Sequence, residues 1–318
     1  MQPIAHRLVS SHRACANLWR FPSVLFVMLR RRFLQSVAAG ALLSLAFADH
    51  GSQAQLQPPA PPSPGVTRFL AVADVGSGDA NQRAVGAQMA VVHRRQPVDL
   101  VVLGGDNIYP SGDMRLIGKT FEQPYAELLA AKVPFHAVLG NHDIRTENGL
   151  PQLAYRPYGM KGRFYSVRKG DVEFFMLDTN GNAPWSQQLA WFRSALSASK
   201  APWKVVVGHH PIYSSGFYGN NSALREKLSS LMQRHGVQLY INGHEHNYER
   251  SKPIDGITYL VVGAGGASLR PVLPTAQSAK GVSVFSFAEI EAGAKALTVT
   301  AWDRNGKQID RAVIATKP

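Results

Sequence analysis

Short apolar runs in this sequence repeatedly end in an aspartate, an asparagine or a histidine. The oxygen and imidazole donors at these ends are Asp74, Asp106, Asn141, His142, Asp143, His209, His210, His244 and His246. A single aspartate after a strand usually forms a turn or caps a helix, and a single histidine is more often packed than a ligand. Here Gly105, Gly140, Gly208 and Gly243 directly precede four of the donor segments, and glycine lets a backbone turn sharply beneath a crowded site. The repeated pattern therefore indicates one site built from several loops.

The chemical types of these side chains favour metal binding. Carboxylate, amide, imidazole and phenol donors without a thiolate suit iron, manganese or zinc. The sole cysteine is Cys15, so a disulfide scaffold, a cysteine-ligated metal site and a thiol nucleophile are all excluded for the chain after residue 54. Two ions would need a shared carboxylate, and we predict that Asp106 supplies it. The apolar run before Asp106 is the most continuous one, which predicts a central strand.

Five motifs in fixed order carry a family resemblance. They are Ala73-Asp74-Val75-Gly76, Gly105-Asp106-Asn107-Ile108-Tyr109, Gly140-Asn141-His142-Asp143, Val206-Val207-Gly208-His209 and Gly243-His244-Glu245-His246. Together they resemble the calcineurin-like metallophosphoesterases. The tyrosine in the second motif narrows the resemblance to the purple acid phosphatases, and the sequence is most similar to their small, mammalian-type branch. The resemblance extends from about Phe69 to the end of the chain.

The resemblance implies two metal ions that share the carboxylate of Asp106. The other implied ligands are Asp74, Tyr109 and His246 for Fe(III), and Asn141, His209 and His244 for Fe(II), Zn or Mn. With these ions, a member of the family hydrolyses phosphate monoesters by attack of metal-bound hydroxide on phosphorus. The alternatives are an exported phosphodiesterase or nucleotidase of the same superfamily and a non-catalytic binding protein with this fold.

Three further side chains have implied roles beside the metals. The resemblance assigns to His142 either protonation of the leaving alkoxide or stabilisation of developing charge. It assigns to Asp143 the task of holding the His142 ring by accepting from the other nitrogen. The role of His210 is open between contact with the phosphate and packing beside the site.

The charge balance of the chain suits an anionic substrate. The formal net charge is +13, and the first 54 residues account for part of it because they hold six arginines and one acid, Asp49. The rest of the chain is still basic, which favours a small phosphate ester as partner. A nucleic-acid partner is not expected, because basic residues are not interleaved with aromatic ones.

The first residues resemble an export signal. Arg30-Arg31-Arg32-Phe33-Leu34 precedes an apolar run, residues 37–48, that is shorter than the roughly 20 residues a spanning helix needs. We therefore predict a leader over residues 1–54 with a twin-arginine-like signal peptide, a partner in the twin-arginine export machinery, and a periplasmic or secreted product without a stable membrane span. Residues 55–66 form a proline-rich linker, and residues 67–318 form the catalytic domain.

The elements that must position the donors alternate between strands and helices. Buried strands are predicted over residues 68–74, 99–106, 134–140, 172–178, 204–210, 237–244 and 258–266. Helices are predicted over residues 81–95, 121–131, 186–198 and 222–235. After residue 281, three runs separated by Gly293 and Asn305-Gly306 predict antiparallel strands. The fold class is therefore α/β, and the resemblance implies a four-layer αββα sandwich of two mixed sheets flanked by helices.

Overall fold

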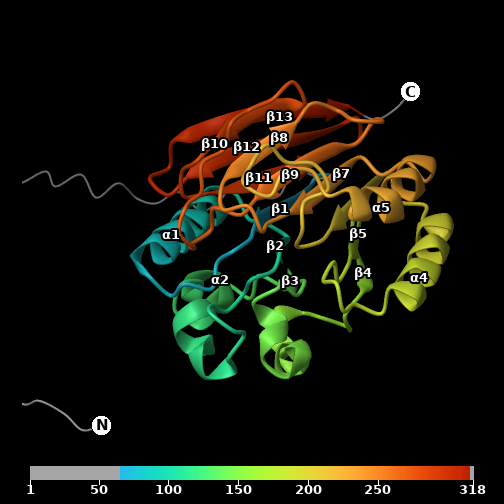
Figure 1. Ribbon diagram of the computed structural model, residues 1–318. Helices are drawn as coiled ribbons and strands as arrows, with labels where there is room; N and C mark the ends of the chain where they lie inside the picture. Colours follow the sequence, from blue (N-terminus) through green and yellow to red (C-terminus); the bar gives the residue numbers. More distant parts are fainter. Residues whose placement is uncertain (1–64, 316–318) are drawn as a thin grey trace, which may run out of the picture. The chain divides into compact units, whose positions relative to one another are not determined.

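The computed structural model describes residues 65–315, and they form two β-sheets with helices outside them (Figure 1). The first sheet has six strands in the order β13-β12-β11-β1-β2-β3. These strands are β1 (Thr67–Val72), β2 (Leu100–Leu103), β3 (Phe135–Ala137), β11 (Ser286–Ala292), β12 (Ala296–Asp303) and β13 (Gln308–Ala315). The sheet is mixed, because β1, β2 and β3 are parallel whereas β11 pairs antiparallel with β1 and is followed by two antiparallel strands.

The second sheet has seven strands in the order β10-β8-β9-β7-β6-β5-β4. These strands are β4 (Tyr165–Lys169), β5 (Val172–Met176), β6 (Trp203–Val207), β7 (Leu239–Asn242), β8 (Tyr248–Ser251), β9 (Thr258–Val262) and β10 (Ser278–Val282). A parallel core of β5, β6, β7 and β9 is flanked by antiparallel strands at both edges. This sheet is therefore mixed as well.

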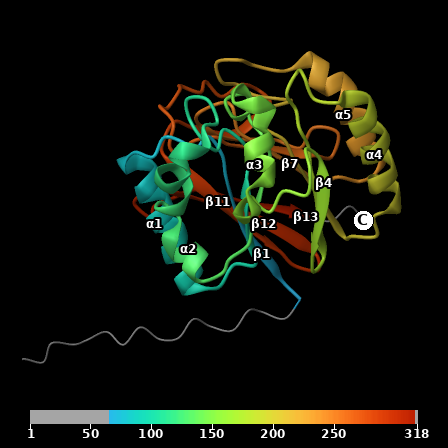
Figure 2. The ribbon, with the colours of Figure 1, turned by 90° about the horizontal axis from the view of Figure 1, so that it is seen from below.

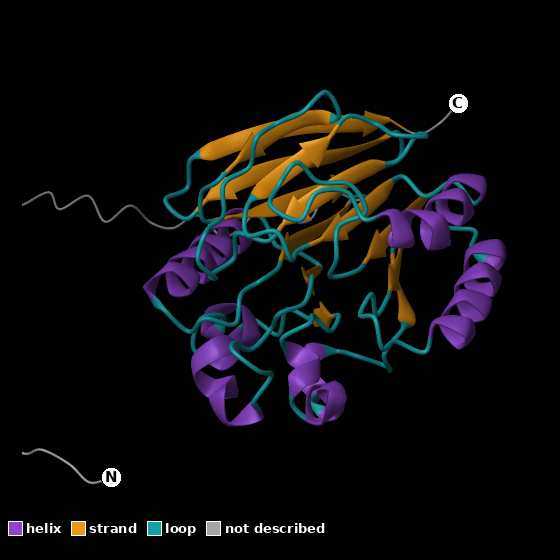
Figure 3. Ribbon diagram, viewed as in Figure 1, coloured by secondary structure: helices purple, strands orange, loops and turns teal. Residues whose placement is uncertain are grey.

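Helices cover the outer face of each sheet, as Figure 3 shows by their position around the strands. They are α1 (Ala80–Arg95), α2 (Ala126–Ala130), α3 (Leu150–Ala154), α4 (Trp185–Ala198) and α5 (Ser222–Arg234). Figure 2 shows α1 and α2 on one side of the strands and α4 and α5 on the other. Three buried clusters fill the spaces between layers: one between the sheets, one between the first sheet and α1, and one beneath α4 and α5. The predicted four-layer sandwich is confirmed.

Local sequence signals set the ends of the longer helices. The side chain of Asp79 accepts from the backbone N–H groups of Asn81 and Gln82 and so caps α1. Asn221 caps α5 in the same way through the N–H of Leu224, and Gly236 follows the end of α5 with a φ of +67°. These helices agree with the prediction within one residue at each end.

Several predicted details are wrong. The helix expected over residues 121–131 is only α2, preceded by a π-helical turn at Gly118–Glu122. The strand before Asp106 is not central, because β2 lies next to the edge strand β3. Strands β4, β8 and β10 were not predicted, since they lack a continuous apolar run.

The predicted leader and proline-rich linker lie outside the described residues, apart from Gly65 and Val66. Among residues 65–315, no helix is both long and apolar enough to cross a bilayer.

Candidate metal centre and active site

The candidate donors lie in turns that follow the carboxyl ends of β1, β2, β3, β6 and β7. Three of them have left-handed backbone conformations, with φ values of +56° at Asp74, +53° at Asp106 and +69° at His244. Such conformations are strained for residues other than glycine and are found where the surrounding structure fixes them. Here the turns hold one another: Asp74 accepts from the His244 N–H at 2.8 Å, and Asp106 accepts from the His142 N–H at 2.9 Å.

Two glycines in the motifs are required by close approach. A Cβ atom at Gly140 would overlap the carboxylate of Asp106, and one at Gly243 would overlap the carboxylate of Asp74. The glycines therefore let neighbouring turns come close enough for their side chains to converge.

The first group of donors surrounds the phenol of Tyr109. Its hydroxyl donates toward the Asp74 Oδ1 and Asp106 Oδ2 atoms, each at 3.0 Å, and lies 3.2 Å from His246 Nε2. His246 Nδ1 donates to the backbone carbonyl of Ser268 at 2.8 Å, which leaves Nε2 facing the group. One phenol, two carboxylates and one imidazole thus converge on one point.

The second group surrounds the amide oxygen of Asn141. Its Oδ1 atom lies 3.1 Å from His209 Nε2 and 2.9 Å from His244 Nδ1. His209 Nδ1 donates to the carbonyl of Gly104 at 3.0 Å, which fixes the tautomer of that ring. Asp106 Oδ2 lies 3.5 Å from His209 Nε2 and 3.0 Å from the Tyr109 hydroxyl, so this one oxygen faces both groups.

Burial keeps two imidazoles of the site neutral and opposes ionisation of its acidic groups. Burial, with the neighbouring imidazole of His209, lowers the pKa of His244 to about 2, and burial lowers the pKa of His209 well below its usual range. Both imidazoles are therefore neutral and offer lone pairs. Burial raises the pKa of Asp74 to about 6, because a carboxylate is costly to ionise away from water and beside Asp106. Burial and the same two carboxylates also raise the pKa of the Tyr109 phenol.

The donor set fits the predicted pair of metal ions. Asp74 is fully buried and Asp106 is 1% exposed, and buried carboxylates this close together are stable in their charged form only beside a positive partner. Potential metal-binding clusters include Asp74, Asp106 and His209 on one side and His209, His210 and His244 on the other. The two clusters share His209, so carboxylate and imidazole donors adjoin in one site of the kind that metal ions bind.

His142 lies at the rim of these groups. Its ring is 4.5 Å from the Tyr109 ring, and its Nε2 atom is 3.9 Å from Asp106 Oδ2. Its Nδ1 atom donates to the backbone carbonyl of Pro110 at 2.7 Å, and Nε2 lies 3.2 Å from the Arg145 guanidinium.

The expectation that Asp143 holds the His142 ring is wrong. Asp143 is fully buried and accepts instead from the backbone N–H groups of Asn107, Ile108 and Gly140 and from the amide of Gln152. The residue faces inward because its neighbours in the turn present several N–H groups that need an acceptor. Asp143 therefore shapes the turn that carries Asp106, and the carbonyl of Pro110 orients His142.

His210 lies beside the second group. Its Nδ1 atom is 3.0 Å from the hydroxyl of Thr179, and its ring centroid is 4.6 Å from that of His244. Burial lowers its pKa. It also lines a cavity of about 310 Å³ next to His244.

Three residues near the site were not singled out from the sequence. The ring of Tyr218 stacks on His244 with centroids 4.3 Å apart, and Arg270 donates to the His244 carbonyl at 2.8 Å. Glu245 is buried and accepts from the Tyr218 N–H. Glu245 stands inside a recognised motif, but no local pattern indicates the position of Tyr218 or Arg270.

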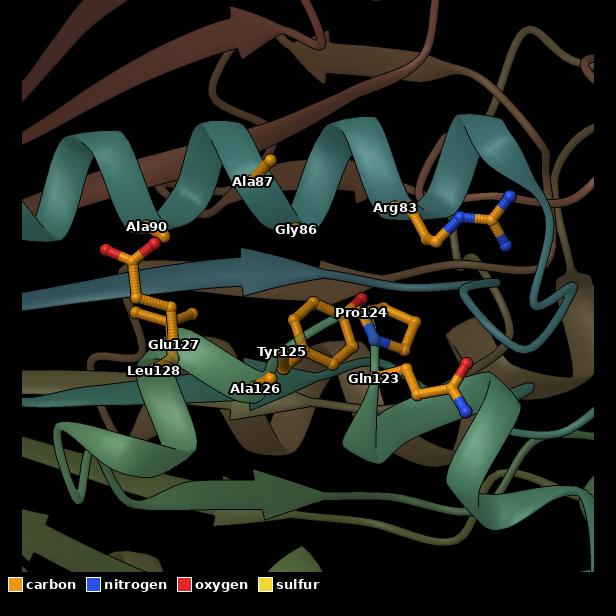
Figure 4. Close-up of a pocket in the computed structure, with 10 residues that line it drawn as sticks. All are labelled: Arg83, Gly86, Ala87, Ala90, Gln123, Pro124, Tyr125, Ala126, Glu127 and Leu128. Atoms are coloured by element: carbon orange, nitrogen blue, oxygen red, sulfur yellow. The ribbon is translucent and has the colours of Figure 1, made fainter.

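A second cavity lies between α1 and the segment 123–128, away from the donors (Figure 4). It has a volume of about 230 Å³ and is lined mostly by small and apolar side chains, with Arg83, Gln123 and Glu127 at its edge. None of the predicted site residues lines it, so we do not assign the chemistry to it.

Comparison with known proteins agrees with this geometry. The family model of the calcineurin-like phosphoesterases matches residues 67–248, the range that contains every candidate ligand. Purple acid phosphatase 3 of Arabidopsis thaliana is 30% identical over 258 residues, covering 71% of this chain and 70% of that protein. Human tartrate-resistant acid phosphatase type 5 is 27% identical over 293 residues, covering 76% of this chain and 89% of that protein.

The solved structure of purple acid phosphatase PPD1 from yellow lupin seeds has the same fold. Its TM-score is 0.68 at 23% identity, over 81% of this chain and 55% of that one. The chain therefore belongs to the calcineurin-like phosphoesterases and, within them, to the purple acid phosphatase family. It is a hydrolase of phosphoric esters.

Proposed function

We propose that this chain is an acid phosphatase with two metal ions that hydrolyses phosphate monoesters. The observation that carries the proposal is the convergence of seven donor side chains in two groups that face the same oxygen of Asp106. Two bound cations would polarise a water for attack on phosphorus and neutralise the phosphoryl oxygens. The relatives named purple acid phosphatase and tartrate-resistant acid phosphatase support this reading.

The two groups divide the ligands as follows. Asp74, Tyr109 and His246 would hold Fe(III); Asn141, His209 and His244 would hold Fe(II), Zn or Mn; and Asp106 would bridge them. The phenol supports the choice of Fe(III), because a hard, trivalent ion stabilises the phenolate that burial among carboxylates otherwise disfavours.

His142 would act on the departing alcohol. The Pro110 carbonyl holds Nδ1–H, so Nε2 is the nitrogen left for proton transfer. We propose that Nε2 carries the proton that passes to the departing alkoxide. Arg145, which lies beside Nε2, would turn to the substrate phosphate.

Substitution of Asp106, the proposed bridging ligand, tests the two-metal proposal. Asp106→Asn should reduce the content of both metals and lower phosphate release by about a hundredfold or more, since the two ions act together. The matched control is Asp255→Asn, in the exposed turn between β8 and β9, which should keep both metals and full activity.

Elemental analysis of the purified protein and rates on paired monoester and diester substrates are the measurements. An Asp106→Asn protein with two metals and full activity contradicts the bridge. A wild-type protein that prefers the diester shows a phosphodiesterase with the same centre.

We also propose that the chain is exported through the twin-arginine pathway to the periplasm or the medium. The support is the sequence of residues 30–34 and the apolar run after it, which lie outside the described residues. Cell fractionation after replacement of the three arginines by lysine tests it, and unchanged export contradicts it.

A further inference from the structure

The hydroxyl of Thr179 lies against the turn that carries two histidines of the site. Thr179 follows β5 and is buried, and its Oγ1 atom accepts from the backbone N–H groups of His209 and His210, each at 3.0 Å. The same oxygen lies 3.0 Å from His210 Nδ1. One hydroxyl therefore contacts this turn at three points.

The surrounding backbone fixes this hydroxyl in place. A Cβ atom at Gly208 would lie 2.6 Å from Thr179 Cγ2, so the turn after β6 can approach this closely because a glycine stands there. On the other side, the amide of Gln188 on α4 accepts from the N–H of Asp178 at 2.8 Å and donates to its carbonyl at 2.9 Å. The residue before Thr179 is thus tied to α4, and the hydroxyl stays where the turn needs it.

The capacity of a hydroxyl for hydrogen bonds decides the direction of its contact with His210. A threonine hydroxyl offers one hydrogen and two lone pairs. The N–H groups of His209 and His210 occupy the lone pairs, so the hydrogen is left for His210 Nδ1. The backbone carbonyl of Thr179 is a competing acceptor for the ring, but a proton on Nδ1 would leave the buried hydroxyl hydrogen without an acceptor. Nδ1 is therefore an acceptor, and the ring carries its proton on Nε2.

The position of this proton matters because His210 lies within reach of a metal ion. One ring nitrogen from each of His209, His210 and His244 lies within 4.8 Å of the others, a spacing at which three histidines could hold one ion. His210 has no free lone pair, however, because Nδ1 accepts from Thr179 and Nε2 carries the hydrogen. The second ion would then keep only the ligands already assigned to it, which leaves a position for water or phosphate.

We propose that Thr179 is a positioning residue, which supports the turn of His209 and keeps His210 out of the ligand set of the second metal ion. The inference rests on the proposed function, because it concerns the coordination of one of the two proposed ions. Groups that orient the ligands of a metal commonly change its affinity by about ten- to a hundredfold when they are removed.

The tautomer of His210 can be measured directly in the wild-type protein. With zinc in both sites the protein is diamagnetic, and long-range proton–nitrogen correlation spectra of histidine-labelled protein distinguish protonated, unprotonated and metal-bound ring nitrogens. His210, assigned by comparison with His210→Ala, should show a proton on Nε2 and an unprotonated Nδ1 that binds no zinc. A proton on Nδ1, or zinc on either nitrogen, overturns the proposal.

Substitutions of Thr179 separate its hydroxyl from its bulk. Thr179→Val keeps the shape but leaves two buried N–H groups without an acceptor, so the zinc affinity of the second site should fall about tenfold. The His210 nitrogens should also shift toward a mixture of tautomers. Thr179→Ser keeps the hydroxyl and should restore both properties. A Val variant with the affinity and the shifts of the wild-type protein overturns the proposal.

The matched control is Thr120→Val. Thr120 is also buried, but its hydroxyl donates to the Leu116 carbonyl at 3.0 Å, outside both donor groups. This variant should change neither the zinc affinity nor the His210 shifts.

Removal of the histidines themselves gives a second measurement, which remains decisive if Thr179→Val does not fold. His210→Ala should keep the second zinc ion with unchanged affinity, whereas His209→Ala should lose it. Loss of the second zinc ion from His210→Ala shows that His210 is a ligand and overturns the proposal.

Activity separates this proposal from the proposed function. If the protein hydrolyses no monoester with any of the proposed metal pairs while His210 shows the proton on Nε2, the phosphatase proposal fails and the role of Thr179 stands. If the protein is an active phosphatase in which His210 binds the metal, the reverse holds.

Discussion

Tyr109 is the residue on which the proposed iron centre depends most directly. Its hydroxyl lies between the carboxylates of Asp74 and Asp106, so the phenolate would bind the first ion together with both of them. A phenolate on Fe(III) absorbs visible light. We expect the oxidised protein to be coloured and Tyr109→Phe to lose the band while the aspartate and histidine ligands remain. Absorption spectra and iron content measure this, and a colourless, fully active protein with two Mn or Zn ions would reject iron.

His142 should affect the chemical step rather than metal binding. Its ring is fixed by the Pro110 carbonyl and contacts Tyr109 through ring edges, but it completes neither donor group. His142→Ala should therefore keep both metals and lose about a hundredfold in kcat on esters with poor leaving groups. Esters with activated leaving groups should lose much less, because their alcohols need no proton. An equal loss on both kinds of ester would indicate charge stabilisation instead.

Among the helices, α5 begins at a residue that both caps the helix and lines the cavity beside His244. The Asn221 side chain accepts from the Leu224 N–H, and the preceding residue, Asn220, accepts from the Ser214 N–H through its side chain. Asn221→Ala should lower the free energy of unfolding by about 1 kcal/mol, the usual effect of losing such a cap. Asn221→Ser should recover most of it, because a hydroxyl can accept the same N–H. Denaturant unfolding measures both, and a Ser variant as unstable as the Ala variant would contradict capping.

A polar cluster connects the two sheets of the domain. Asp310 on β13 accepts from Arg250 at 2.7 Å and from the Tyr248 hydroxyl at 2.8 Å, and both of these lie on β8 in the other sheet. Burial opposes the charge of Asp310, but the hydrogen bonds from Arg250 and Tyr248 outweigh it and hold its pKa below the ordinary 3.8.

Because the pKa of Asp310 is lower in the folded state, this cluster stabilises the protein more at neutral pH than in acid. The cluster stabilises the protein fully above the unfolded pKa near 3.8, and this contribution is lost as the pH falls through the lower folded value. Asp310→Asn should therefore lower the free energy of unfolding by about 2 kcal/mol at pH 7, and by clearly less at pH 3. Chemical denaturation at both pH values, with Asp255→Asn as a control, measures the difference. An effect independent of pH would mean that shape, rather than charge, matters at this position.

The sequence alone was sufficient for most of the fold, and it singled out donor side chains that the structure brings close together. Seven of the strands follow from continuous apolar runs, and the donors follow because they stand where those runs end. Both signals are local: burial of a strand needs consecutive apolar residues, and a turn at its end needs glycine or a short polar side chain. The ends of α1 and α5 were equally local, since capping involves residues within one turn.

Only the tertiary structure decided which groups meet. Strands β4, β8 and β10 carry few apolar residues and exist because neighbouring strands offer hydrogen bonds. Strand β3 is one edge of the sheet, and the distant β11 extends the sheet on the far side of β1. Strand β2 therefore lies away from the centre, which no local pattern encodes.

Long-range contacts also explain why the partner of His142 was predicted wrongly and why Tyr218 and Arg270 were not predicted. The family resemblance suggested Asp143 as the partner of His142, but successive residues in a turn point in different directions, and the carbonyl of Pro110 reaches the ring instead. Tyr218 meets His244 only because the folded sheet brings the loop after β6 beside the turn after β7. The sequence determined which side chains could do the chemistry, and the packing of the two sheets determined which of them lie within reach of one another.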